Sequence, residues 1–445
     1  MSQPRIGFVT CVHPFYEMPA VAEARQRAID ALRQSGCEVI AAASPRNSHD
    51  AMETAKRFRH DGIDLTVLFF CTWVAEDITL ALARELMDVP MLLWALPYLD
   101  RDVPMPSPMS GLTSSGSNIR RLGMRFIHQV GGVTPGNVVK VLRAAKVAAV
   151  AQGLRRARFG IIGDACPGMI DVEADEAEIQ KALGATVVHL DLDTLLKSAE
   201  AASPKEASRA AGSLLRAARG EREIDEQRLA ENLRLYVGLK ETIRQNTLDA
   251  YCVRCWPELR DQRKITPCAA HALLAEEGVP NTCEVDLPAL IATWILSRMA
   301  DAPAFNFDIT AYLEEEGAIQ LAHCGAAAPS LAGDPESASI RAHMRTGTGA
   351  TVEFPFKPGA VTLAKLLRPN NGKLTLAAAG GEVVSSEGIR GSVATVRPNP
   401  SAAALVDWLM REAVEHHIAL AYGSWLSDLE MFCEFAGIQF ITPQR

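Results

Sequence analysis

The first 95 residues alternate short apolar segments with amphipathic segments, and this alternation limits the possible fold more than any other feature of the chain. The apolar segments are typical of buried strands, and the segments between them repeat their apolar residues at helical spacing. Strands that alternate with helices form a parallel sheet covered by helices on both faces. The expected strands are 5–10, 38–42, 65–70 and 90–95, and the expected helices are 20–35, 49–61 and 77–87.

Polar and aromatic residues follow these strands at their carboxyl ends, where parallel sheets bind ligands. His13 follows the first strand and Trp73 follows the third, so we expect both side chains to line a substrate site. The Gly-x-Gly-x-x-Gly sequence of dinucleotide-binding proteins is missing after the first strand, which argues against a nucleotide cofactor.

The same α/β pattern restarts at Arg158, and beyond about residue 330 it gives way to short strands separated by Pro-Gly and Gly-Gly turns. We therefore predict an α/β fold with two doubly wound parallel-sheet domains and a smaller, β-rich, barrel-like domain. The predicted boundaries are 1–155 for the amino-terminal domain, 156–330 for a central domain that carries metal-binding carboxylates, and 331–445 for the β-rich domain that carries a late histidine.

Charge and hydropathy exclude several classes of function. The net charge of −8 argues against a nucleic-acid-binding surface. No signal peptide is recognisable at the amino terminus and no apolar run reaches membrane-spanning length, so we expect a cytoplasmic protein with no membrane partner. The ten cysteines lie in apolar segments, which favours buried, reduced thiols. Cys252 and Cys255 form a lone Cys-x-x-Cys pair, for which we expect a structural or pocket-lining role.

A polar run at 113–118, followed by a helix that is expected to begin at Ile119, has two possible interpretations. Its backbone amides could hold a phosphate or sugar hydroxyls at a helix start. Alternatively, it is a surface loop that ends in an ordinary helix cap.

Two carboxylates lie at the ends of apolar elements, where solvation alone does not explain them. Glu284 precedes an apolar helix that Asp286 caps and Pro288 opens, and Asp308 is expected at the carboxyl end of a short buried strand, 304–307. Such positions can converge on one edge of a crevice. With a histidine they would form an oxygen-rich site that suits Mn²⁺ or Mg²⁺.

Two histidines are candidates for the nitrogen ligand. His323 follows the second carboxylate closely, and His417 lies in the β-rich region. The alternative for all four residues is structural: Glu284 is then a loop carboxylate, Asp308 a helix cap, and both histidines belong to the core.

A divalent cation flanked by two carboxylates can catalyse proton transfer between neighbouring carbons of a polyol. The cation stabilises the enediolate charge, and one carboxylate moves the proton from one carbon to the next. The expected enzyme is therefore a metal-dependent ketol isomerase, which interconverts aldoses and ketoses through an enediol intermediate.

Four segments of the carboxyl-terminal half resemble the L-fucose isomerase and L-arabinose isomerase superfamily. They are Cys255-Trp256-Pro257-Glu258-Leu259, Cys283-Glu284-Val285-Asp286, Phe307-Asp308 and 416–423, which reads HHIALAYG. The resemblance spans roughly 250–445, whereas the first 250 residues match only in the order of their α/β units.

The resemblance implies a role for each matching residue. Glu284 and Asp308 would be metal ligands and acid/base groups, His417 would be the imidazole ligand, and His323 would be a weaker fourth ligand. Trp256 and Glu258 would line the sugar site. It also implies Mn²⁺ as cofactor and a homo-oligomer whose active sites are shared between subunits.

The chain departs from both branches of that superfamily. It is shorter than typical fucose isomerases, and His416-His417 resembles the arabinose branch while Asp308 resembles the fucose branch. The identity of the sugar substrate is therefore left open. The alternative functions are a cytoplasmic sugar-binding or sensing protein and a metal-dependent epimerase or aldolase that acts on a related sugar.

Overall fold

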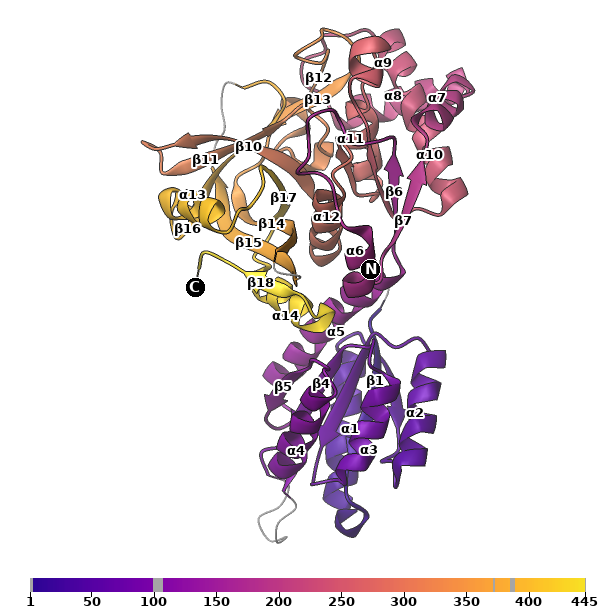
Figure 1. Cartoon of the computed structure of the whole chain (residues 1–445), viewed down its shortest axis with the longest axis vertical. Coiled ribbons are helices and arrows are strands. Elements are labelled where there is room, and N and C mark those ends of the chain that lie inside the picture. Colours follow the sequence, from indigo (N-terminus) through magenta and orange to yellow (C-terminus); the bar gives the residue numbers. More distant parts are fainter. Residues whose placement is uncertain (1–2, 99–106, 371–372, 385–388, 445) are drawn as a thin grey trace. The chain divides into compact units, whose positions relative to one another are not determined.

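The computed structural model describes residues 3–98, 107–370, 373–384 and 389–444 (Figure 1). The chain divides into two compact units. The first contains Met1–Leu154 and returns to include Asp428–Gly437, and the second contains Arg155–Ser427 and Ile438–Arg445.

The first unit is built on a five-stranded parallel sheet with strand order β2-β1-β3-β4-β5. Its central strand, β3, reads LTVLFF and is buried along its whole length, as expected where helices cover both faces. Residues of α1 and α5 pack on one face, and residues of α2, α3 and α4 pack on the other. The strands are β1 (Arg5–Cys11), β2 (Glu38–Ala42), β3 (Leu65–Phe70), β4 (Met91–Ala95) and β5 (Ile127–Val130). The helices are α1 (Pro19–Gln34), α2 (Ser48–His60), α3 (Glu76–Glu85), α4 (Pro108–Arg121), α5 (Pro135–Arg156) and α14 (Leu426–Ala436).

The polar run 113–118 lies inside α4, so both interpretations offered for it are wrong. Ser115 and Gly116 of this run are buried, and the Thr79 hydroxyl donates to Ser115 Oγ at 3.0 Å. The small side chains of this run allow α4 to pack closely against α3. The run lies within the helix and therefore offers no free amino terminus for binding an anion.

The second unit contains a four-stranded parallel sheet with order β7-β6-β8-β9. Its strands are β6 (Arg158–Ile162), β7 (Thr186–Leu190), β8 (Ala250–Val253) and β9 (Asn281–Cys283). The helices of this unit are α6 (Glu176–Leu183), α7 (Leu192–Glu200), α8 (Pro204–Ala217), α9 (Glu226–Asn232), α10 (Arg234–Asn246), α11 (Cys268–Glu276), α12 (Leu287–Ala300) and α13 (Ala402–Arg411).

A nine-stranded mixed sheet completes the second unit, in the order β12-β13-β16-β11-β10-β17-β14-β15-β18. Because β15 also pairs with β16, six of these strands form a closed ring of antiparallel pairings. Strands β10 and β11 precede residue 331, the predicted start of the β-rich domain, and belong to the same sheet. The strands are β10 (Phe305–Leu313), β11 (Ala318–His323), β12 (Ser339–Arg341), β13 (Thr351–Pro355), β14 (Gly359–Asn370), β15 (Lys373–Val384), β16 (Ser392–Asn399), β17 (His417–Tyr422) and β18 (Gln439–Ile441).

One hydrophobic cluster joins the parallel sheet to the mixed sheet within the second unit. It includes Tyr251 from β8, Phe307 from β10 and Leu420 from β17. The helix α12 is buried on nearly every side and contacts both β14 and β17. The residues that lie near the amino terminus of α12 are therefore held against the mixed sheet.

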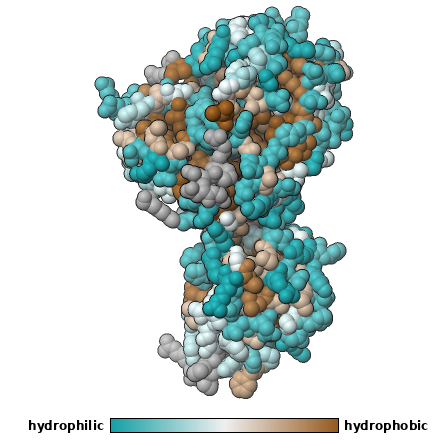
Figure 2. Space-filling model, viewed as in Figure 1, coloured by the Kyte–Doolittle hydropathy of each residue, from teal (hydrophilic) through white to brown (hydrophobic). Residues whose placement is uncertain are grey.

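The surface is mostly hydrophilic on the face of each unit shown in Figure 2. Among the described residues, no helix has the length and apolar character needed to span a bilayer. The ten cysteines are all free thiols, as predicted.

Candidate metal and substrate site

Asp308 and His417 are direct neighbours across two antiparallel strands. Strand β10 pairs with β17, and in this register Asp308 lies opposite His417. The prediction that Asp308 ends a short strand is wrong, because β10 continues to Leu313 and Asp308 is its fourth residue. Pairing of the two strands brings together a carboxylate and an imidazole that are far apart in the sequence.

Glu284 follows β9 in a turn with an unusual backbone conformation. Its φ is +65° and that of Val285 is +63°, in the left-handed region that side chains other than glycine rarely adopt. Strained conformations of this kind cluster at functional sites. The indole N–H of Trp256 donates to Glu284 Oε1 at 3.1 Å, which fixes the direction of the carboxylate.

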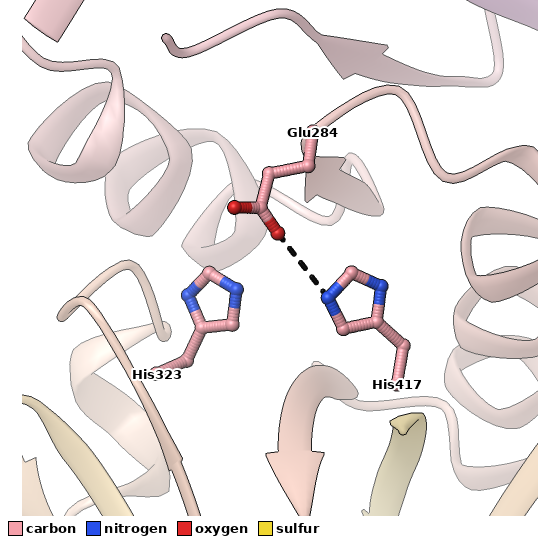
Figure 3. Close-up of side chains that lie close together, drawn as sticks. All are labelled: Glu284, His323 and His417. Carbon is pink, nitrogen blue, oxygen red and sulfur yellow. Dashed lines mark ion pairs between the residues drawn. The ribbon is translucent and has the colours of Figure 1, made fainter. Parts of the chain in front are cut away.

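His417 directs one ring nitrogen at both carboxylates. Its Nε2 lies 3.2 Å from Glu284 Oε2 and 3.2 Å from Asp308 Oδ1. The side chain is only 1% exposed, yet in the described structure Nε2 makes no hydrogen bond. Figure 3 shows Glu284 and His417 pointing toward each other, with His323 beside them. A buried nitrogen without a hydrogen bond, close to two carboxylate oxygens, is the arrangement that a cation ligand needs.

The other ring nitrogen of His417 is held by Asp286. Nδ1 lies 2.7 Å from Asp286 Oδ2, which also accepts from Lys365 Nζ at 3.0 Å. Asp286 Oδ1 accepts from the Ala289 N–H at 2.6 Å, so the predicted helix cap is confirmed. Sequence reasoning assigned Asp286 only this capping role and overlooked Lys365, whose charge within an apolar strand was the available signal.

The proximity of these groups shifts their pKa values. Burial lowers the pKa of His417, but its contacts with Asp286, Asp308 and Glu284 outweigh burial and raise it to about 11. Burial raises the pKa of Glu284 and of Asp308, but contact with His417 lowers both below their ordinary values. Without a cation, both ring nitrogens of His417 are therefore protonated. A metal ion must displace the proton on Nε2 in order to bind.

Two further histidines border the site. His323 Nδ1 accepts from the Cys324 N–H at 2.9 Å, so the proton of the neutral ring lies on Nε2. Burial lowers the pKa of His323, but Cys324, Asp308 and Glu284 raise it to about 9. His416 directs Nδ1 to Asp171 Oδ2 at 2.7 Å and Nε2 to Asp308 Oδ1 at 3.7 Å.

Two overlapping groups of side chains could hold a metal ion. One is Glu284, His323 and His417, and the other is Asp308, His416 and His417, with ligand atoms in each group within 4.8 Å of one another. His417 belongs to both groups. Two carboxylates with one imidazole match the oxygen-rich donor set that Mn²⁺ or Mg²⁺ accepts. The residues therefore fit the predicted cation.

A pocket in the second unit opens onto these residues. Glu284, Asp308, His323 and Trp256 line it. Of the two cysteines for which a structural or pocket-lining role was predicted, Cys255 lines the pocket and Cys252 is buried. The remaining lining residues include three with basic side chains, which sequence reasoning did not identify: Arg260, His343 and Arg345. The pocket thus combines candidate metal-binding groups with positive charge.

In the described structure, the other predicted substrate residues make other contacts or lie in the first unit. Glu258 pairs with Arg254, with Oε2 and Nε 2.8 Å apart, and is not among the lining residues. His13 and Trp73 belong to the first unit, where their rings stack with centroids 5.3 Å apart.

Comparison with characterised proteins identifies sulfoquinovose isomerases as relatives. Those of Priestia aryabhattai and Priestia megaterium are each 26% identical to this chain over 413 residues, which is 90% of this chain and 90% of each relative. That of a Clostridium species is 24% identical over 368 residues, which is 80% of this chain and 82% of the relative. These relatives confirm the prediction of an isomerase enzyme that interconverts sugars. No protein-family model matches the chain.

Solved structures add nothing to this comparison. A substrate-binding protein with adhesive properties from Clostridium difficile is 14% identical, over 63% of this chain and 74% of its own, with a TM-score of 0.19. A similarity at this level carries no argument about fold or function.

Proposed function

We propose that this protein is a divalent-metal-dependent aldose–ketose isomerase, and that its substrate is sulfoquinovose or another sugar with an anionic group. The observation that carries the proposal is the position of His417 Nε2, which is buried, makes no hydrogen bond in the described structure and lies 3.2 Å from both Glu284 and Asp308. The L-fucose and L-arabinose isomerases use a similar set of residues, which supports the same chemistry here.

Glu284, Asp308 and His417 would hold the cation, with Mn²⁺ as the expected ion. When bound, it supplies a Lewis acid that stabilises negative charge on two adjacent sugar oxygens. One of the two carboxylates takes the proton from carbon 2 of the aldose and returns it to carbon 1, while the hydroxyl proton of oxygen 2 passes to oxygen 1, which gives the ketose. The indole of Trp256 holds Glu284 in a fixed direction during both transfers.

The basic residues of the pocket support an anionic substrate. Sulfoquinovose carries a sulfonate on carbon 6, remote from the two carbons that react. Guanidinium groups bind such anions through several parallel hydrogen bonds. Arg260 and Arg345 both line the pocket that Glu284 and Asp308 line, so a sugar bound there would lie near both kinds of group.

Turnover of defined sugars tests the proposal. Purified protein with Mn²⁺ is incubated with sulfoquinovose, glucose, fucose or arabinose in D₂O, and the ketose product is measured by NMR. We expect sulfoquinovose to be converted fastest, and we expect deuterium at carbon 1 wherever the carboxylate exchanges its proton with solvent. Glu284→Gln and Asp308→Asn should each abolish conversion. Failure to convert any of these sugars in the presence of Mn²⁺ would contradict the proposal.

We further propose that the protein acts as a homo-oligomer. The side chain of Asp308 is 38% exposed in the single chain, whereas enediol chemistry is favoured when water is excluded. A neighbouring copy that covers this carboxylate would exclude water. Light scattering combined with size-exclusion chromatography measures the oligomeric state, and a monomer under assay conditions would contradict this part of the proposal.

A further inference from the structure

We propose that Asp286 is a positioning residue that fixes the His417 ring so that its Nε2 lone pair faces the cation. This inference rests on the proposed function, because it assumes that Glu284, Asp308 and His417 bind a metal ion. It goes further by assigning a role to residues that do not touch the cation or the sugar.

The direction of the hydrogen bond fixes the tautomer. An ionised carboxylate only accepts hydrogen bonds, so His417 Nδ1, 2.7 Å from Asp286 Oδ2, must carry a proton. In the neutral imidazole the second nitrogen then has a free lone pair. That nitrogen is Nε2, which lies between Glu284 and Asp308.

Asp286 is suited to this role because every neighbour favours its charged form. Its side chain is only 1% exposed, and burial alone would favour the neutral acid. The Ala289 N–H at 2.6 Å and the positive end of the α12 dipole stabilise the carboxylate on one side. The Lys365 ammonium, at 0% exposure and 3.0 Å, stabilises it on the other. Lys365, which also lies 3.7 Å from Glu415 Oε2, offsets part of the charge of Asp286, and the imidazole becomes neutral once a bound cation displaces the proton from Nε2.

His323 provides a contrast within the same pocket. Its Nδ1 accepts a hydrogen bond from the Cys324 backbone, so its proton lies on Nε2. In this neutral tautomer, Nε2 has no free lone pair with which to bind a metal ion. We therefore infer that His417 is the imidazole ligand and that His323 donates a hydrogen bond to a carboxylate or to the sugar.

The test reverses the hydrogen bond without removing the helix cap. In Asp286→Asn the amide oxygen can still accept from Ala289, while the amide NH₂ group faces His417 Nδ1 and Lys365. The imidazole proton is then expected on Nε2, where it blocks the metal ion. Binding of Mn²⁺ is measured from the electron paramagnetic resonance signal of the free ion, so the readout does not depend on turnover. Partners of metal-binding histidines typically change affinity by about 10- to 100-fold, and we expect a loss in this range.

A double-mutant comparison separates positioning from general damage to the structure. If Asp286 acts through His417, the Asp286→Asn change should weaken Mn²⁺ binding by less than about threefold when His417 is already glutamine, because coupled residues are not additive. Asp225→Asn is the matched control, since Asp225 caps α9 by accepting from the Arg228 N–H at 2.7 Å. This control should bind Mn²⁺ as the unchanged protein does.

Asp286→Asn could fail to fold because Lys365 loses its ion pair with Asp286. A second variant provides the test in that case. Asp286→Asn combined with Lys365→Met removes both charges but retains the reversed hydrogen bond, and we expect the same loss of Mn²⁺ affinity. Unchanged affinity in either folded variant overturns the inference and leaves the proposed function intact. Absence of Mn²⁺ binding by the unchanged protein overturns both.

Discussion

Replacement of Arg260 by glutamine tests whether the pocket recognises an anionic substituent on the sugar. The Arg260 side chain is 16% exposed, and its guanidinium lies 5.4 Å from the centre of the Trp256 ring. Its Nε and Nη2 donate to the two oxygens of Asp261 at 2.7 and 3.0 Å. The remaining donors of the guanidinium are available to a substrate, because Arg260 lines the pocket.

The expected effect follows from the burial and partners of this arginine. Two unit charges 4 Å apart interact by about 4 kcal/mol at the effective dielectric constant of a partly buried site. Because Asp261 already pairs with the guanidinium, we expect Arg260 to contribute less than this to sulfonate binding. The expected contribution is the net value of a hydrogen bond to a charged group, about 2 kcal/mol. That value corresponds to a loss of roughly 30-fold in kcat/KM for the sulfonated sugar.

The assay compares charged and neutral sugars. We measure kcat/KM with sulfoquinovose, and the dissociation constants of sulfoquinovose and glucose, for the unchanged protein and for Arg260→Gln. The dissociation constant of glucose should change by less than about threefold in Arg260→Gln, because glucose has no anionic group for the guanidinium to bind. Arg263→Gln is the matched control, because Arg263 pairs with Glu200 at 3.1 Å and is not among the pocket-lining residues. Equal losses for both sugars in Arg260→Gln would refute charge recognition by this residue.

Three further predictions concern single side chains of the second unit. Trp256→Phe removes the hydrogen bond to Glu284 at 3.1 Å, and since bonds to charged groups contribute about 1.5–3 kcal/mol, kcat/KM should fall at least tenfold, whereas circular dichroism should stay unchanged. Lys365→Met removes the ammonium that lies 3.0 Å from the buried Asp286 carboxylate, so urea denaturation should show a loss of about 3–5 kcal/mol in the free energy of unfolding, with a smaller loss when Asp286→Asn is added. Burial lowers the pKa of His271 from 6.5 to about 4, despite its contact with Asn281, so the folded state binds fewer protons than the unfolded state between these values. His271 should therefore stabilise the fold fully above pH 6.5 and lose about 3 kcal/mol as the pH falls to 4. His271→Gln should lack this dependence in denaturation experiments, and an equal pH dependence in both proteins would contradict the assignment.

The parallel sheet of the first unit could be predicted because its signal is local. Each strand is a short apolar run, and helical periodicity separates one strand from the next. The extent of β10 could not be predicted in this way. Its apolar run ends at Phe307, but the strand continues with partly exposed residues to Leu313 because pairing with β11 supplies its hydrogen bonds.

The candidate site depends on contacts between distant segments, which a single sequence does not reveal. The carboxylates Glu284 and Asp308 were identified by their positions at element ends. The residues alone left both His323 and His417 as candidates for the nitrogen ligand, and only resemblance to known isomerases favoured His417. The pairing of β10 with β17 provides the physical reason for that link. The role of Asp286 was missed because its capping position already explained it, and Lys365 gave no local signal beyond a charge in an apolar strand.

The antiparallel pairing of Asp308 with His417 would also limit how the proposed metal site adapts to cations of different radius. Opposite residues on paired strands keep a Cα separation of about 4.5–5.5 Å, which the backbone hydrogen bonds of a closed ring maintain. Glu284 is different, because it projects from a left-handed turn outside that ring. Two of the three proposed ligands would therefore keep a fixed separation, and the turn at Glu284, with the indole that holds it, would have to adjust to a larger or smaller ion.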